Sequence, residues 1–235
     1  MNQFKRLAVI VAIAAGFGGG VSSAQAATVK LDGVAFDIYY DDTALDLFGT
    51  PTLSGDVLYF TPTSFKAESL NGAGVASTAS TINLRVELND GYDFTSIGLV
   101  ERGDYRLRGA SSEVDVLGQL RVFDADAPLT DATDRLQTTG ALSLNDGLNY
   151  NWEAGADIGL TGPMWSDTRM INVTIENLLD AYTDPLDVGR KQAFVEKKFV
   201  GLVIGAVAAV PEPESYALML AGLGMIGLVA RRRRH

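Results

Sequence analysis

Four aspartates stand close together in one acidic segment, at Asp124, Asp126, Asp131 and Asp134. Calcium takes about six to eight oxygen ligands, and clustered carboxylates in a loop can supply them. The segment departs from the EF-hand pattern, because Pro128 occupies a ligand position and no glycine follows it. The sequence therefore leaves two alternatives, a calcium-binding loop or a solvated acidic loop, and it predicts no other cofactor.

A second acidic group could carry out glycoside hydrolysis, which needs only two carboxylates. Glu101 and Asp104 stand three residues apart, and Glu113 and Asp115 follow. The alternative is solvated charge at a strand end and a turn, neutralised by neighbouring arginines. Those arginines are Arg102, Arg106 and Arg108.

Other catalytic classes lack their residues. The chain has no cysteine, and its one histidine is His235. A thiolate nucleophile, a Ser-His-Asp triad and a Cys/His zinc site are therefore excluded. We find neither a glycine-rich phosphate loop nor a Gly-x-Ser-x-Gly elbow, and we expect that the chain is not an enzyme.

Another hypothesis is carbohydrate binding, in which exposed aromatic side chains form a platform for stacking against sugar rings. The competing interpretation is that the tryptophans belong to the core and the tyrosines are scattered along strands. The residues concerned are Tyr39, Tyr40, Tyr92, Tyr150, Trp152 and Trp165.

Residues 1–26 have the pattern of a signal peptide. Lys5 and Arg6 precede an apolar stretch at 7–21, and Ala24 and Ala26 give the small-x-small pattern that signal peptidase cleaves. We expect export through the Sec translocon and cleavage after Ala26.

The remaining middle, residues 27–210, is strongly acidic. Six of the 19 basic residues and two of the 29 acidic residues lie in the two ends, which leaves 13 Lys and Arg against 27 Asp and Glu. Such a surface repels nucleic acid, so we expect no nucleic-acid partner. Without cysteines, this domain is held by its core alone, or by its core and bound ions.

The elements that must position these groups are strands. Apolar and polar residues alternate over 82–88 and 171–176, which is typical of half-buried antiparallel strands, and Asn-Asp-Gly at 89–91 and 145–147 marks tight turns. We predict an all-β fold, an antiparallel β-sandwich or jelly-roll-like domain of about eight strands. The strands are expected near 28–40, 55–61, 81–88, 94–101, 112–123, 140–153, 169–177 and 197–209. Single helical turns are expected at 41–48 and 176–182, and a flexible loop at 72–80.

The C-terminus has three parts in a fixed order. Pro211, Glu212 and Pro213 form an extended segment, an apolar helix follows at 215–230, and the chain closes with an arginine cluster. This apolar run is shorter than the about 20 residues a membrane-crossing helix needs, so it is expected to act as a weak, temporary anchor. The arginines are Arg231, Arg232, Arg233 and Arg234.

These three parts together resemble the PEP-CTERM sorting signal of Gram-negative bacteria. The resemblance covers residues 211–235 and implies cleavage by an exosortase near the Pro-Glu-Pro triplet. It departs from the pattern at Glu214, where a small residue often follows the triplet. It further implies transient anchoring in the inner membrane, followed by transfer to the cell surface or to an exopolysaccharide matrix such as a biofilm. It assigns no activity to residues 27–210.

Three functions remain in competition for that middle domain. The first is a non-enzymatic structural component of the cell surface or extracellular matrix. The second is a carbohydrate-binding module, with or without calcium. The third is a glycan-active enzyme. The partners expected are the Sec translocon, signal peptidase, an exosortase and extracellular polysaccharide.

Overall fold

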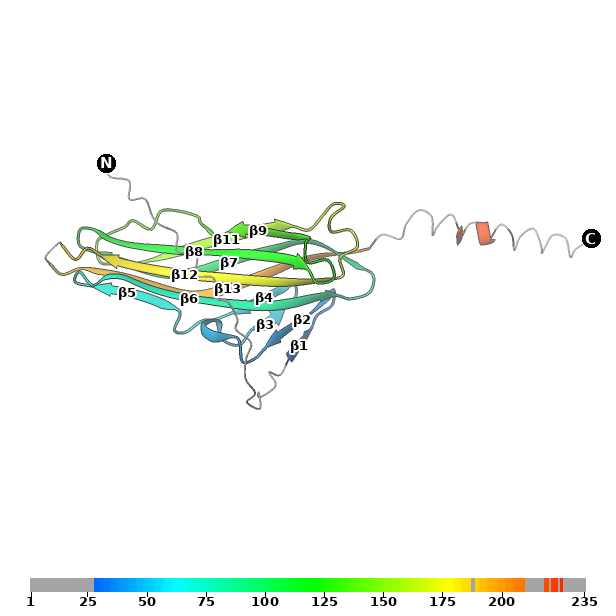
Figure 1. The fold of residues 1–235 in the computed structure, drawn as a ribbon, viewed down its shortest axis with the longest axis horizontal. Helices are drawn as coiled ribbons and strands as arrows, with labels where there is room; N and C mark the ends of the chain where they lie inside the picture. Colours follow the sequence, from blue (N-terminus) through cyan, green and yellow to red (C-terminus); the bar gives the residue numbers. More distant parts are fainter. Residues whose placement is uncertain (1–27, 187–188, 210–217, 220, 224, 226–235) are drawn as a thin grey trace, which may run out of the picture.

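The protein is described by a computed structural model covering residues 28–186, 189–209, 218–219, 221–223 and 225. Two antiparallel sheets stack face to face, and their long strands run along the longest dimension (Figure 1). The predicted all-β sandwich is confirmed. The signal peptide with Ala24 and Ala26 lies outside the described residues, as do the Pro-Glu-Pro triplet and the four C-terminal arginines.

The first sheet has six strands in the order β1-β2-β6-β12-β8-β9. Its central pair consists of the long strands β6 and β12, which are in register from Gly74 and Thr183 to Glu87 and Met170. The bounds are β1 Thr28–Asp32, β2 Phe36–Asp41, β6 Gly74–Leu88, β8 Ser112–Asp124, β9 Asp131–Arg135 and β12 Met170–Thr183.

The second sheet has seven strands, with the order β10-β11-β7-β13-β4-β3, and β5 also pairs with β13. The central strand β13 pairs with β7 along one side and with β5 and then β4 along the other. The bounds are β3 Thr52–Ser54, β4 Val57–Phe60, β5 Lys66–Leu70, β7 Tyr92–Arg108, β10 Gln137–Thr138, β11 Asn149–Gly159 and β13 Gln192–Ala208.

The alternating sequences form strands because each buries one face against the opposite sheet. In β6, Leu84 and Val86 are buried opposite Val173 and Ile171 of β12, while the residues between them stay exposed. Burying such side chains supplies about 25 cal/mol per Å² of apolar surface. The tight turn predicted at 89–91 forms with Gly91 at φ +82°, and it carries the chain from the first sheet to the second.

Two local expectations were wrong. The expected loop at 72–80 begins with a turn, but Gly74 onward extends β6, because the backbone there pairs with β12 as far as Thr183. The expected helical turn at 176–182 is the second half of β12, which is paired on both sides, with β6 and with β8. In both cases long-range pairing overrides the local signal.

The strand count and two further boundaries also differ from expectation. The sandwich has thirteen strands rather than about eight, because short strands such as β3, β9 and β10 pair along the edges. The strand expected at 140–153 begins only at Asn149. The helical turn expected at 41–48 is a 3-10 helix at Asp46–Phe48, preceded by a turn in which Thr43 donates to Asp41.

Helical residues follow the sandwich at 218–219, 221–223 and 225. Within the described part of the chain, no helix has the length and apolarity needed to cross a membrane.

Candidate functional site

The first aspartate of the acidic segment closes a turn. Asp124 ends β8 and is buried, and its Oδ1 accepts hydrogen bonds from the backbone N–H groups of Asp126, at 2.7 Å, and Ala127, at 2.9 Å. Its Oδ2 accepts from the hydroxyl of Thr168 at 2.5 Å. Burial raises the pKa of Asp124, but the Thr168 and backbone donors outweigh it, so the net shift is downward.

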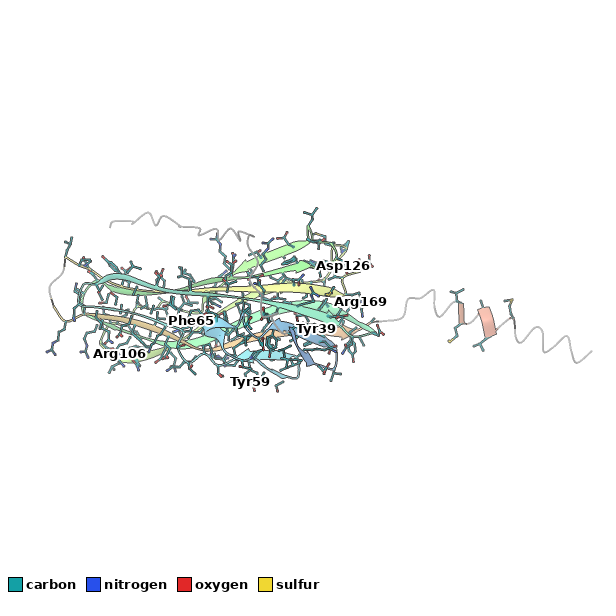
Figure 2. The ribbon with its side chains drawn as sticks, turned by 60° about the horizontal axis from the view of Figure 1, so that its bottom comes forward. Tyr39, Tyr59, Phe65, Arg106, Asp126 and Arg169 are labelled. Atoms are coloured by element: carbon teal, nitrogen blue, oxygen red, sulfur yellow. The ribbon has the colours of Figure 1, made fainter. Side chains whose placement is uncertain are left out.

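The remaining acids of this segment have separate partners. Asp131 pairs with Arg121 at 3.3 Å, while Asp134 accepts from the backbone N–H of Asp157 at 2.9 Å. Asp126 is exposed at the end of the sandwich where Arg169 also lies, far from Arg106 (Figure 2). Among the described residues, no group of three or more His, Cys, Asp or Glu side chains could hold a metal ion. Calcium binding by Asp124, Asp126, Asp131 and Asp134 therefore stays a prediction.

The four acids considered for glycoside hydrolysis are divided between the two sheets. Glu101 and Asp104 belong to β7, whereas Glu113 and Asp115 belong to β8. Glu101 points into the core, while Asp104 pairs with Lys198 at 2.6 Å. This arrangement gives no support to a pair of carboxylates acting on one substrate.

Two of the neighbouring arginines have partners other than these four acids. Arg102 pairs instead with Glu153 of β11 at 2.7 Å, and Arg106 donates to Asn149 at 2.7 Å.

The aromatic residues do not form one platform. Trp152 and Trp165 are both buried. Tyr39 and Tyr40 lie on β2 of the first sheet, while Tyr150 lies on β11 of the second.

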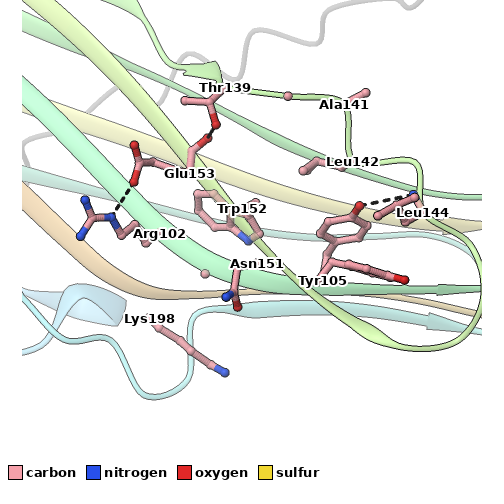
Figure 3. A pocket seen from close by; sticks show the side chains of 13 residues that line it. Arg102, Tyr105, Thr139, Ala141, Leu142, Leu144, Asn151, Trp152, Glu153 and Lys198 are labelled. Carbon is pink, nitrogen blue, oxygen red and sulfur yellow. Dashed lines mark hydrogen bonds and ion pairs between the residues drawn. The ribbon is translucent and has the colours of Figure 1, made fainter.

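A shallow groove of about 640 Å³ does combine aromatic and polar groups. It lies along β7 and β11 beneath the segment that precedes β11, and Figure 3 shows Trp152 between the Arg102–Glu153 pair and Tyr105. The Tyr105 and Tyr150 rings lie 5.9 Å apart, and the Tyr105 hydroxyl accepts from the Leu144 backbone. The polar side chains that line the groove include Arg102, Asn151, Glu153 and Lys198.

The most unusual group in the sandwich is a buried lysine. Lys197 and Glu101 have fully buried side chains, 0% exposed, and form an ion pair. The Lys197 amine also donates to Oδ1 of Asn177, a residue that is only 3% exposed. Lysine and glutamate are almost never fully buried unless they are paired.

Strand geometry brings these three groups together. Glu101 lies on β7, Lys197 on the neighbouring β13, and Asn177 on β12 of the opposite sheet. A register shift between Lys197 and Phe199 marks a bulge in β13. Bulges re-aim side chains and interrupt pairing. On the other side of β13 the backbone N–H of Lys197 donates to the carbonyl of Phe65, at 2.9 Å.

Aromatic rings surround the Lys197 amine, which lies 5.1 Å from the centre of the Phe65 ring and 6.0 Å from that of Trp152. Phe65 is fully buried and lies within the layers of the sandwich (Figure 2). Trp152 reaches this position because Gly103 has no side chain: a Cβ there would come within 2.7 Å of the indole ring. The indole N–H donates to the carbonyl of Glu196.

Two polar atoms of the cluster lack hydrogen-bond partners, Oε1 of Glu101 and Nδ2 of Asn177. A buried polar atom left unpaired costs about 1–3 kcal/mol, so such atoms usually mark a functional or strained position.

Sequence reasoning missed this cluster. The sequence pattern presents Glu101 as a possible glycosidase carboxylate or as solvated charge, and Lys197 as the start of an apolar strand, and neither interpretation places the two side chains together in the core. One signal was available: Ala193, Val195 and Lys197 alternate on one face, so the lysine occupies an inward-facing position.

The fold and the C-terminal features define an antiparallel β-sandwich followed by a sorting segment. Residues 209–234 match the model of the PEP-CTERM protein-sorting motif. The resemblance seen in the sequence is therefore confirmed, and the motif marks an exported protein of Gram-negative bacteria. Such a protein is sorted by an exosortase and held transiently in the membrane by its C-terminus.

No curated protein sequence matches the chain. Among solved structures, the chain is similar to one described as the structure of infectious bursal disease virus Gt strain, with 12% identity over 82% of this chain and a TM-score of 0.23. The Gx strain gives 11% identity over 76% of this chain and a TM-score of 0.24. The matched regions cover 60% and 51% of those viral chains.

Proposed function

We propose that the sandwich is a non-enzymatic structural component of the cell surface or of the extracellular polysaccharide matrix. The observation that carries this proposal is the position of the sorting motif. The last strand, β13, ends at Ala208, and the motif begins at residue 209. Cleavage at the Pro-Glu-Pro triplet would therefore release the thirteen-stranded sandwich with no strand removed.

The surface chemistry supports the same role. The acidic middle of the chain favours solubility outside the cell and repulsion from anionic lipid. Several described acids have structural uses: Asp124 closes a turn, Asp131 and Glu153 form ion pairs, and Glu101 belongs to the buried cluster.

The experiment compares wild-type cells with cells lacking the exosortase. Mass spectrometry of the protein from the surface and matrix fractions should find a C-terminus between Val210 and Pro213 in wild-type cells. In the deletion strain the intact chain, ending at His235, should stay in the membrane fraction. An intact tail on the wild-type protein, or its absence from the surface and matrix, would contradict the proposal.

A second candidate function is binding of the cell's own polysaccharide. The groove favours it, because the half-buried ring of Tyr150 lines it beside hydrogen-bonding groups, and sugars bind through aromatic faces combined with such groups. Tyr105 and Trp152 also line the groove, but their rings are buried. Asn151 and Lys198 line the same groove and would supply such groups.

Calorimetric titration with exopolysaccharide extracted from the same cells tests this candidate. Asn151→Ala and Lys198→Ala should each weaken binding roughly tenfold, the effect of losing about 1.4 kcal/mol. Lys30→Ala, a change of an exposed lysine on the first sheet, serves as the control and should bind like the wild type. Absence of binding by the wild-type protein would eliminate this candidate.

A further inference from the structure

The buried cluster places an amine directly against a carboxamide. The Nζ atom of Lys197 contacts Oδ1 of Asn177 and Oε2 of Glu101, in a part of the core that excludes water. A primary amine, a primary amide and a carboxyl group are the three reactants and catalysts that amide exchange requires. Their joint burial costs free energy, and hydrophobic residues of similar volume would often be at least as stabilising in their place. The cluster is therefore better explained by a chemical role than by stability alone.

An ion pair by itself leaves the cluster incomplete. Nδ2 of Asn177 and Oε1 of Glu101 have no hydrogen-bond partner. Nδ2 is the atom that would depart if Asn177 were acylating an amine, and its departure would remove the unpaired donor from the core.

We propose that Lys197 and Asn177 become joined by an intramolecular isopeptide bond between Nζ and Cγ, which the folded domain forms by itself with Glu101 as the catalytic residue. Nothing else is consumed, because the reaction needs no oxidant, reductant or added co-reactant. The overall change is one ammonium and one amide converted into a secondary amide and an ammonium ion.

The steps follow from the contacts. The Lys197 ammonium first gives a proton to the Glu101 carboxylate, and the neutral Nζ attacks Cγ of Asn177. The carbonyl electron pair moves onto Oδ1, where the Glu101 carboxyl proton stabilises the developing charge. Nζ then gives up a second proton, which Glu101 transfers to Nδ2. The Cγ–Nδ2 bond breaks with its electron pair on nitrogen, and ammonia leaves; it becomes ammonium when it takes the last proton from Glu101.

The surroundings favour this reaction over hydrolysis. The rings of Phe65 and Trp152 lie beside the amine, and the burial of Asn177 and Lys197 limits the access of water to the reacting groups. Burial also lowers the pKa of Lys197, although the Glu101 carboxylate acts in the opposite direction, and the neutral amine is the nucleophile. Fixed strands hold the reacting groups together, which replaces a bimolecular encounter by a unimolecular step.

A glycine leaves room for the side chain of Asn177. Gly118 of β8 is the direct neighbour of Asn177 in the first sheet, and a Cβ there would come within 2.3 Å of the Glu176 carbonyl and 3.3 Å of Oδ1 of Asn177. The cross-link would join the central strands of the two sheets, β12 and β13.

Tryptic mapping of the protein purified from its own cells tests the proposal directly. Trypsin cleaves after Arg169, Arg190, Lys191 and Lys198, but not after an acylated Lys197. The folded wild-type protein should yield one branched peptide that joins 170–190 to 192–198, lighter than the two separate peptides by one ammonia. Recovery of 170–190 and 192–197 as separate peptides from protein with an intact β-sheet spectrum would overturn the proposal. Peptide mapping also separates this loss from ammonia lost by succinimide formation at Asn71-Gly72.

Three variants test the assigned roles, each in protein whose β-sheet spectrum matches the wild type. Asn177→Asp should still form the branched peptide but lose water instead of ammonia, because a hydroxyl is then the leaving group. Lys197→Arg keeps the cation and should give only separate peptides. Glu101→Gln should leave Lys197 and Asn177 unlinked, and a cross-link formed as completely as in the wild type would remove Glu101 from the mechanism.

Discussion

Lys197 and Asn177 lie on strands that follow each other in the chain but belong to opposite sheets, and their side chains meet in the core. β13, which carries Lys197, is also the strand from which the sorting motif extends. Any pull on the C-terminus therefore reaches β13 first. A covalent bond at Lys197 would pass that load to β12, the central strand of the other sheet.

The cross-link should stabilise the sandwich. It closes a segment of 20 residues, and a covalent link over a loop of that size is worth about 3 kcal/mol through the unfolded state. Asn177→Ala should therefore lower the free energy of unfolding by about 3 kcal/mol, measured in guanidinium chloride by tryptophan fluorescence. Asn177→Asp, which keeps the acceptor carbon, is the matched control and should stay near the wild type. Equal midpoints for Asn177→Ala and wild type would speak against a stabilising link.

Gly103 should tolerate no side chain. A Cβ there would lie 1.9 Å from the carbonyl oxygen of Glu196 and 2.7 Å from the ring of Trp152, and the backbone cannot move away cheaply. Gly103→Ala should destabilise the fold by about 1–3 kcal/mol. Gly159→Ala, at the end of β11 with open space around it, is the control and should change the melting temperature little. Similar melting curves for both variants would show that the core adjusts around Gly103.

Asp124 should make the free energy of unfolding of the sandwich depend on pH in the acidic range. Its folded-state pKa is below the ordinary value of 3.8, so its contribution is present above pH 3.8 and is lost as the pH falls through the folded value. Asp124→Asn should cost about 1–2 kcal/mol at neutral pH, and this difference should shrink below pH 3.8.

Urea denaturation at several pH values measures this effect. Asp126→Asn changes an exposed neighbour and should follow the wild-type curve. A difference between Asp124→Asn and wild type that is independent of pH would contradict an ionic role for Asp124.

Removal of divalent cations should leave the sandwich unchanged. Among the described residues, the four aspartates considered as calcium ligands have protein partners or lie apart and form no cluster of three carboxylates, so we expect a chelator to change the stability little. Thermal melts with EDTA and with added calcium should coincide. A rise in melting temperature with calcium that is lost in Asp131→Asn would instead support the calcium-binding loop.

The Pro-Glu-Pro triplet should be needed for processing but not for folding. It follows the last strand, so replacing Pro211, Glu212 and Pro213 by alanine should leave the melting temperature unchanged. The same replacement should keep the C-terminal tail on the protein in cells, as seen by mass spectrometry. Normal cleavage of this variant would show that the protease recognises another part of the motif.

Much of the sandwich could be predicted because its signal is local. The alternation of Ile82, Leu84, Val86 and Leu88 defines a strand with one buried face, and these four side chains are buried in the structure. The first half of β6 could not be predicted in this way. Its Gly, Ala, Ser and Thr residues have no apolar period, and the strand forms there because β12 lies alongside it.

Local patterns in the chain are sufficient to predict the fold class and the sorting motif, since strand periodicity and the order of triplet, apolar run and arginines are read from adjacent residues. The contact among Glu101, Asn177 and Lys197, by contrast, arises only in the folded domain. Glu101 and Lys197 are 96 positions apart, and Asn177 reaches them from the opposite sheet. Their meeting depends on which strands pair, where β13 bulges and which faces of the two sheets oppose each other. These three features depend on the packing of the whole core, so they cannot be predicted from any local stretch of the chain.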